Sequence, residues 1–196
     1  MIASTPATTH DLLKAISQVV GPSNREQLIR LHEPDFKDTQ AWTYVKDCLD
    51  TGWVSTTGSW VSRFEKELST FTGAQHVIAV SNGTVALRLA LYLVGVKPDD
   101  EVMIPSLSFV ATANAVAHLG AYPHFVDVNP LGLGLSPNAL RVRLEKVAEW
   151  HDGRIVNRET GRRIAAVLPV HVFGHPADMN QLRSVADDWK LPLIED

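Results

Sequence analysis

Apolar residues in the first third of the chain recur every three or four positions, the spacing of one face of a helix. The pattern predicts helices over about residues 12–20, 24–31, 40–51 and 59–71, with glycine near the end of three of them. Between the last two helices lies Gly52–Gly58, a loop bounded by glycine and rich in hydroxyl groups. This part of the chain is therefore predicted to be helical.

From about residue 77 the pattern changes, because short apolar runs alternate with helical stretches. Strands are expected at 77–80, 101–104, 124–128, 164–172 and 191–194, and helices at 84–94, 109–118, 136–150 and 178–189. Such alternation is typical of a mainly parallel sheet with helices on both faces. The charged segment 154–163 is expected to be an exposed turn or hairpin insert before the fourth strand.

The composition is that of an ordinary globular protein, with 196 residues, 45% hydrophobic and 20% charged. The formal net charge is −4 and no basic stripe is visible, so we expect no nucleic-acid partner. A single cysteine, Cys48, excludes an intramolecular disulfide and a multi-cysteine metal site, and we expect no metal. Because the start lacks the features of a signal peptide and no apolar stretch approaches about 20 residues, we expect a cytoplasmic protein without a membrane partner.

Candidate chemistry lies at the carboxyl ends of the predicted strands, where open α/β sheets bind ligands. Ser81-Asn82-Gly83-Thr84 opens directly into a helix and could bind a phosphate through free N–H groups, although a simple capped helix would have the same residues. Phe109 follows the next strand and could stack on a planar ligand, or be an ordinary core residue.

Two further strand ends carry titratable side chains. His171 could touch a ligand or be a structural histidine. Glu195-Asp196 follows the last strand, where a pyridinium nitrogen would hold a carboxylate ionised; the alternative is two solvated residues. A phosphate cradle, a stacking aromatic and a carboxylate on successive strand ends suit a phosphorylated aromatic cofactor such as pyridoxal phosphate.

Several segments in the same order resemble the pyridoxal-phosphate-dependent nucleotide-sugar aminotransferases of the DegT/StrS type. The matching stretches are GWVSTTG (52–58), FEKELSTFTGAQHVIAVSNGTVALRLAL (64–91), GVKPDDEVMIPSLSFVATANAV (95–116), PHFVDV (123–128), LPVHVFGHPADM (168–179) and LPLIED (191–196). The resemblance implies an α/β fold, the N-terminal part of a fold-type I aminotransferase large domain, preceded by a helical segment. Within the family, the sequence is most similar to aminotransferases on routes to legionaminic acid or bacillosamine.

The resemblance also implies roles for single positions. Gly83 and Thr84 match the phosphate-binding pair, Phe109 the aromatic residue that stacks on the pyridine ring, and Asp196 the carboxylate that pairs with the pyridine nitrogen. The hydroxyl-rich loop matches part of a substrate entrance. Its candidate substrate residues, together with His171, are Trp53, Ser55, Thr56 and Thr57.

One departure from the family concerns the Schiff-base lysine, which relatives place beyond the Glu-Asp pair. None of the lysines of this chain stands in that context. We therefore expect residues 1–58 to form the helical segment and entrance loop, and 59–196 an incomplete cofactor-binding domain without the C-terminal small domain. Such a fragment is expected to be catalytically incompetent alone and poorly soluble.

The function that the resemblance implies for the whole enzyme is transfer of an amino group from glutamate to a 4-keto-6-deoxy (amino)sugar nucleotide. The enzyme would be a homodimer in surface-polysaccharide, lipopolysaccharide or nonulosonate biosynthesis. Two alternatives stay open: a sugar dehydratase of the same family, and a short non-catalytic protein that binds a phosphorylated ligand or dimerises with a relative.

Overall fold

The computed structural model describes residues 8–20 and 34–196, and the chain divides into two units, residues 1–63 and 64–196. The boundary falls inside a helix, whereas the sequence places a domain boundary at 58/59; the two predicted domains stay a prediction. Among the described residues of the first unit, three helices begin: α1 (Thr9–Val20), α2 (Ala41–Thr51) and α3 (Ser59–Thr72). They confirm three predicted helices, and the fourth, 24–31, lies outside the described residues.

In the first unit, α2 and the start of α3 meet through aromatic side chains. The ring centroids of Tyr44 and Trp60 lie 4.4 Å apart, and the Trp60 indole N–H donates to the Asp47 carboxylate at 2.6 Å. Between them, α2 ends at Gly52, whose positive φ of 73° favours glycine. The glycine stop predicted from the sequence is therefore present.

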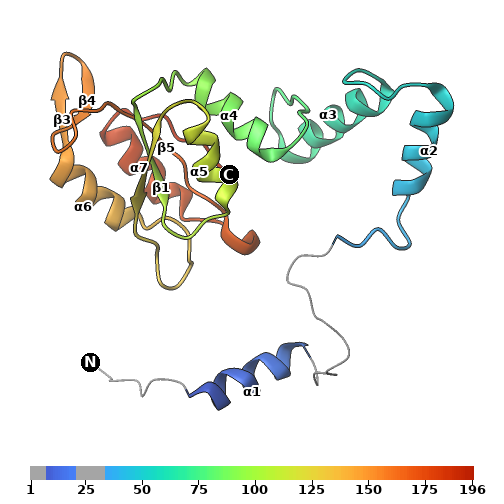
Figure 1. Cartoon of the computed structure of the whole chain (residues 1–196), viewed down its shortest axis with the longest axis horizontal. Coiled ribbons are helices and arrows are strands. Elements are labelled where there is room, and N and C mark those ends of the chain that lie inside the picture. The colour runs from blue at the N-terminus through green and yellow to red at the C-terminus, as the bar shows by residue number, and fades with distance from the viewer. Residues whose placement is uncertain (1–7, 21–33) are drawn as a thin grey trace. The chain divides into compact units, whose positions relative to one another are not determined.

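A parallel three-stranded sheet forms the centre of the second unit (Figure 1). Its order is β2 (Tyr122–Val126), β1 (Glu101–Pro105) and β5 (Ile164–Val167). In register, Met103 of the central strand lies opposite His124 on one side and Val167 on the other. A bridge from Val167 to Leu193 adds the last predicted strand beside β5 as a single parallel pairing.

Helices cover both faces of this sheet, as the sequence predicts. They are α4 (Gly83–Leu93), α5 (Val110–Ala117), α6 (Pro137–Val147) and α7 (Met179–Asp188). Met103 packs in one apolar core with α6 and α7, and Val102 and Ile104 in a second core with α4 and α5. The alternation arises because successive side chains of a strand point to opposite faces.

The predicted strand at 77–80 is wrong. No described strand pairs with it, and Ile78 is 72% exposed. The Ala79 N–H instead donates to the Glu65 carboxylate at 2.8 Å. A β-branched apolar run favours extended backbone, but a strand exists only where a partner strand accepts its hydrogen bonds.

The predicted helix over 136–150 ends early, because a hairpin replaces its last turn. The strands β3 (Ala148–His151) and β4 (Arg154–Asn157) pair in antiparallel fashion. Asp152 and Gly153 between them both have positive φ, the backbone that a two-residue hairpin turn requires. The hairpin expected before the fourth sheet strand is thus present, but it starts at residue 148.

The predicted strand at 164–172 is also shorter than expected. β5 ends at Val167, and residues 172–174 form a 3₁₀ turn, η1 (Val172–Gly174). Pro169 has no N–H to donate, which limits further ladder pairing. The adjacent backbone still pairs with the end of the chain, since the Asp196 N–H donates to the Pro169 carbonyl at 3.0 Å.

Candidate functional site

Asp196 lies at the carboxyl edge of the sheet and is fixed by both its backbone and its side chain. Its carbonyl accepts the His171 N–H at 2.9 Å, which continues the pairing beside β5. Its carboxylate accepts a hydrogen bond from the hydroxyl of Thr112, a residue with no exposed surface in the first turn of α5. A buried donor therefore holds an exposed carboxylate in one orientation, next to a helix N-terminus that favours negative charge. Figure 1 shows this end of the chain beside α5.

Phe109 is hydrogen-bonded to the same threonine through its backbone carbonyl. It is the N-cap residue of α5, in extended backbone, and its carbonyl accepts the Thr112 N–H at 3.1 Å. The ring is 74% exposed, so no core packing occupies it. Thr112 thus bonds both the backbone carbonyl of Phe109 and the carboxylate of Asp196, and we call these three residues the Phe109–Thr112–Asp196 corner. Such a corner can offer a flat cationic ring both a stacking partner and a counter-charge.

Thr112 itself is a residue that the sequence reasoning missed. It stands three positions after Phe109, where the first turn of a helix returns to the same face. A lone hydroxyl in the apolar stretch of residues 109–118 was the available signal, since a buried hydroxyl needs a partner.

Gly83 and Thr84 begin α4, which packs on α5 through the second core. The Asn82 side chain caps the helix by accepting the Val85 N–H at 2.9 Å. Nothing lies within 4 Å of a Cβ built on Gly83, so there is open space beside this backbone. Among the described residues, no hydrogen bond or ion pair joins Gly83 or Thr84 to the Phe109–Thr112–Asp196 corner.

His171 has an observed structural role. Its Nδ1 accepts the Ala177 N–H at 3.1 Å, so the proton of the neutral ring lies on Nε2, which faces the Glu195 carboxylate at 3.2 Å. The ring therefore ties the turn around η1 to the end of the chain. Contact of His171 with a substrate stays a prediction.

The candidate substrate loop belongs to the first unit and is described there by itself. Trp53, Ser55, Thr56 and Thr57 are all exposed. A Cβ built on Gly58 would lie 3.5 Å from the Trp53 side chain, and the hydroxyls of Ser55 and Thr57 are 3.5 Å apart.

A buried polar cluster lies at the opposite, amino edge of the sheet. The Glu101 carboxylate accepts hydrogen bonds from Thr160, Asn157 and Nδ1 of His124 at 2.6, 2.8 and 2.7 Å. Since Nε2 of His124 accepts from the Arg143 guanidinium at 2.8 Å, the imidazole carries its single proton on Nδ1. Burial alone would raise the pKa of Glu101, but the hydrogen bonds from Asn157, Thr160 and His124 outweigh burial and lower the pKa below its ordinary value.

The described residues contain neither a cluster of metal-ligating side chains nor a helix that could span a membrane. Residues 8–20 and 34–196 hold no group of three or more histidine, cysteine or carboxylate side chains that could ligate a metal ion. No helix in these two stretches has the length and apolar character to span a bilayer.

Residues 36–196 match the profile of the DegT/DnrJ/EryC1/StrS aminotransferase family. The chain belongs to this family. GDP-perosamine synthase of Vibrio cholerae is 36% identical over 86% of this chain and 41% of its own length. The 3-oxo-glucose-6-phosphate:glutamate aminotransferase of Bacillus subtilis is 36% identical over 78% of this chain and 31% of its own length. The chain therefore spans less than half the length of either relative.

A solved structure agrees with this family assignment. The crystal structure of NtdA from Bacillus subtilis with bound cofactor PMP (pyridoxamine phosphate) has a TM-score of 0.65 and 34% identity, over 79% of this chain and 32% of NtdA. The α/β fold and the family expected from the sequence motifs are thereby confirmed. Pyridoxal phosphate is likewise confirmed as the cofactor of the family.

Proposed function

We propose that the chain is the N-terminal part of a sugar aminotransferase and that its Phe109–Thr112–Asp196 corner binds the ring of pyridoxal phosphate. The observation that carries the proposal is the double attachment of Thr112, whose N–H holds Phe109 and whose hydroxyl holds Asp196. An exposed ring and an oriented carboxylate are the two groups that a protonated pyridine needs.

When bound, pyridoxal phosphate supplies an electron sink that allows an amino group to pass between donor and acceptor. Asp196 would keep the pyridine nitrogen protonated, and the exposed Phe109 side chain would stack on the cofactor ring. Thr112 would be a positioning residue, because its hydroxyl orients the Asp196 carboxylate. Gly83 and Thr84 would hold the phosphate through the free N–H groups of α4, beside which there is open space.

The finer function rests on the relatives. We infer that the whole enzyme aminates a 4-keto-6-deoxy (amino)sugar nucleotide, with glutamate as donor, as a cytoplasmic homodimer in surface-polysaccharide synthesis. The names of the perosamine synthase and of the glutamate-dependent Bacillus enzyme support a sugar acceptor and a glutamate donor. The hydroxyls of the Trp53–Thr57 loop and His171 would contact this substrate.

We also propose that residues 1–196 hold the cofactor without a covalent link and do not transaminate alone. Lys97 precedes β1 and Lys190 precedes the last strand, so both lie at the amino edge of the sheet. Asp196 lies at the carboxyl edge. Lys66 and Lys146 are exposed residues of α3 and α6.

Two measurements on the purified chain test these proposals. Titration with pyridoxamine phosphate, followed by cofactor fluorescence, should saturate at one cofactor per chain; no binding at about 1 mM, a free energy of −4.1 kcal/mol, would contradict the cofactor site. Borohydride reduction with pyridoxal phosphate, followed by peptide mass spectrometry, should give only scattered labelling. Specific modification of one lysine would contradict the non-covalent site.

A further inference from the structure

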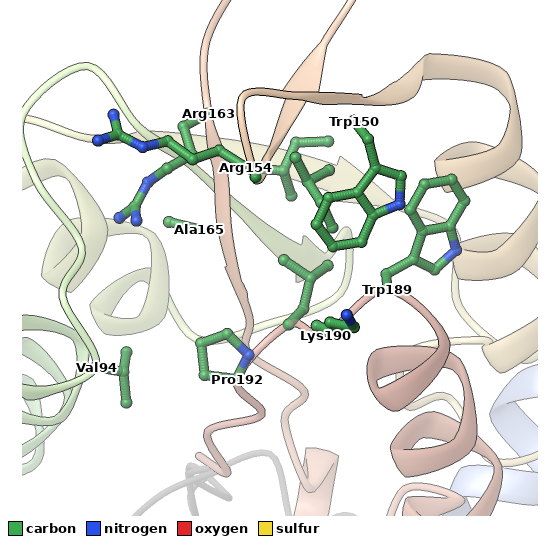
Figure 2. Close-up of a pocket in the computed structure, with 12 residues that line it drawn as sticks. Val94, Trp150, Arg154, Arg163, Ala165, Trp189, Lys190 and Pro192 are labelled. Atoms are coloured by element: carbon green, nitrogen blue, oxygen red, sulfur yellow. The ribbon is translucent and has the colours of Figure 1, made fainter.

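A pocket of about 200 Å³ opens at the amino edge of the sheet, between the β3–β4 hairpin, the end of α7 and the end of α4. Its walls include two tryptophans, three cations and a proline: Trp150, Arg154, Arg163, Trp189, Lys190 and Pro192. We call it the Trp150–Trp189 pocket. Figure 2 shows the Arg154 and Arg163 side chains extending toward one end of the pocket and both indoles at the other end.

The charge of this pocket differs from that of the chain. The protein has 22 acidic residues and a net charge of −4, yet none of the described residues that line the pocket is acidic. Asp100 does not line the pocket, and it already pairs with Arg163: its carboxylate accepts hydrogen bonds from Nε and Nη2 of Arg163 at 3.0 and 2.6 Å. Within residues 8–20 and 34–196, no carboxylate pairs with Arg154. The pocket therefore presents uncompensated positive charge.

Lys190 is held at the pocket in an unfavourable backbone conformation. It follows α7 with a φ of 52°, a left-handed position that usually takes glycine. Its N–H bonds the Asp187 carbonyl and the next N–H bonds the Ala186 carbonyl, so a Schellman turn fixes it there. Its Nζ lies 5.5 Å from the centre of the Trp150 ring. A lysine where glycine would relieve strain points to use of its ammonium group.

The indoles supply flat apolar surface beside these cations. Trp150 is 50% exposed although it is the largest side chain of the hairpin, and Trp189 is partly buried against the first core. Indole surface stacks on planar rings, and guanidinium and ammonium groups bind phosphate or carboxylate oxygens. Both kinds of group line one cavity, so one ligand can contact both.

We propose that the Trp150–Trp189 pocket binds an anion that carries a flat ring, of the nucleoside monophosphate type. The ring lies against the indoles beside the Lys190 ammonium group, and the phosphate is bound at the other end of the pocket by Arg154, with Arg163 anchored beside it by Asp100. The pocket is smaller than the roughly 300–1,000 Å³ of sites for drug-sized ligands, so it accepts a ring and leaves the remainder of the ligand at the open rim. The site lies at the other edge of the sheet from Asp196 and does not depend on the proposed cofactor site.

The test is calorimetric titration of the whole chain with uridine and guanosine 5′-monophosphate, with uridine and inorganic phosphate as partial ligands. We expect a Kd below about 1 mM for at least one nucleotide and binding at least fivefold weaker for each partial ligand. Arg154→Ala and Lys190→Gly should each weaken nucleotide binding at least fivefold; glycine suits the left-handed turn, so Lys190→Gly removes the side chain with its ammonium group and keeps the backbone turn. Arg183→Ala, an exposed arginine of α7 outside the pocket, is the matched control.

Several results would overturn the proposal. They are the absence of nucleotide binding at 5 mM, equal affinity for phosphate and nucleotide, or equal weakening by Arg183→Ala and Arg154→Ala. Pyridoxamine phosphate is itself a flat-ring anion, so it is titrated into the same variants and into Asp196→Asn. If Arg154→Ala abolishes its binding and Asp196→Asn does not, the cofactor site is misplaced; nucleotide binding that survives Asp196→Asn supports the separate pocket.

Discussion

Replacing Thr112 by valine removes the hydroxyl that holds Asp196 and keeps the shape of the side chain. A hydrogen bond to a charged acceptor contributes about 1.5–3 kcal/mol when it is lost from a buried site. Because Asp196 is exposed, water replaces part of this, and the new methyl group is buried. We therefore expect the free energy of unfolding to fall by only about 1 kcal/mol, a Tm lower by about 2–4 °C for a chain of this length.

The effect on cofactor affinity should exceed the effect on stability. Without the Thr112 hydroxyl, the Asp196 carboxylate can rotate. Forming its ion pair with the pyridine nitrogen then costs the conformational entropy of fixing the carboxylate. We expect the Kd for pyridoxamine phosphate to rise about 3- to 10-fold, up to about 1.4 kcal/mol. Circular dichroism melts and fluorescence titration measure the two quantities.

Thr112→Ser separates orientation from packing. Serine keeps the hydroxyl but removes a fully buried methyl group, which costs about 1 kcal/mol of stability. We expect a Tm as low as that of Thr112→Val but a cofactor affinity near wild type. Serine and valine variants that bind the cofactor equally weakly, or a valine variant with unchanged affinity, would refute the positioning role.

Three further predictions concern single residues. Phe109→Leu should change stability by less than about 0.5 kcal/mol, because the ring is exposed, but weaken pyridoxamine phosphate binding about 2- to 10-fold; equal affinity would exclude stacking. Gly134→Ala should cost about 1–3 kcal/mol in chemical denaturation, since its Cβ would lie 3.0 Å from Ala177, whereas Gly132→Ala, with open space, is the control. The pKa of Glu101 is lower in the folded chain than its ordinary value, so ionised Glu101 stabilises the fold at pH values above that ordinary pKa. This stabilisation is lost as the pH falls through the folded pKa. The stability difference between wild type and Glu101→Gln should therefore shrink below about pH 4.3; a constant difference would contradict this.

The sequence predicted the elements whose signals are local. Ser136 before Pro137 predicts the start of α6, and the Ser136 hydroxyl indeed accepts the Ala139 N–H at 3.2 Å. The alternation of strands and helices predicted a parallel sheet covered on both faces, because this pattern leaves few other ways to bury the apolar runs.

The elements that the sequence reasoning misplaced depend on partners or on a turn signal that was overlooked. The run at 77–80 has strand composition, but strand formation is decided by a neighbouring strand. The Asp152-Gly153 pair is a strong hairpin signal, and helical spacing up to Trp150 concealed it. Thr112 could not be assigned to Asp196 from spacing, since 84 residues separate the two and only the fold brings them together.

The central claim is that the carboxylate of Asp196 binds the cofactor ring, and the neighbouring carboxylate provides the control. Pyridoxamine phosphate is titrated into wild type, Asp196→Asn and Glu195→Gln, all at one pH. Asp196 is held by Thr112, whereas Glu195 faces His171. We predict saturable binding by wild type and Glu195→Gln, with at least tenfold weaker binding by Asp196→Asn. Equal affinity of the two variants, or no binding by wild type, would contradict the proposed site.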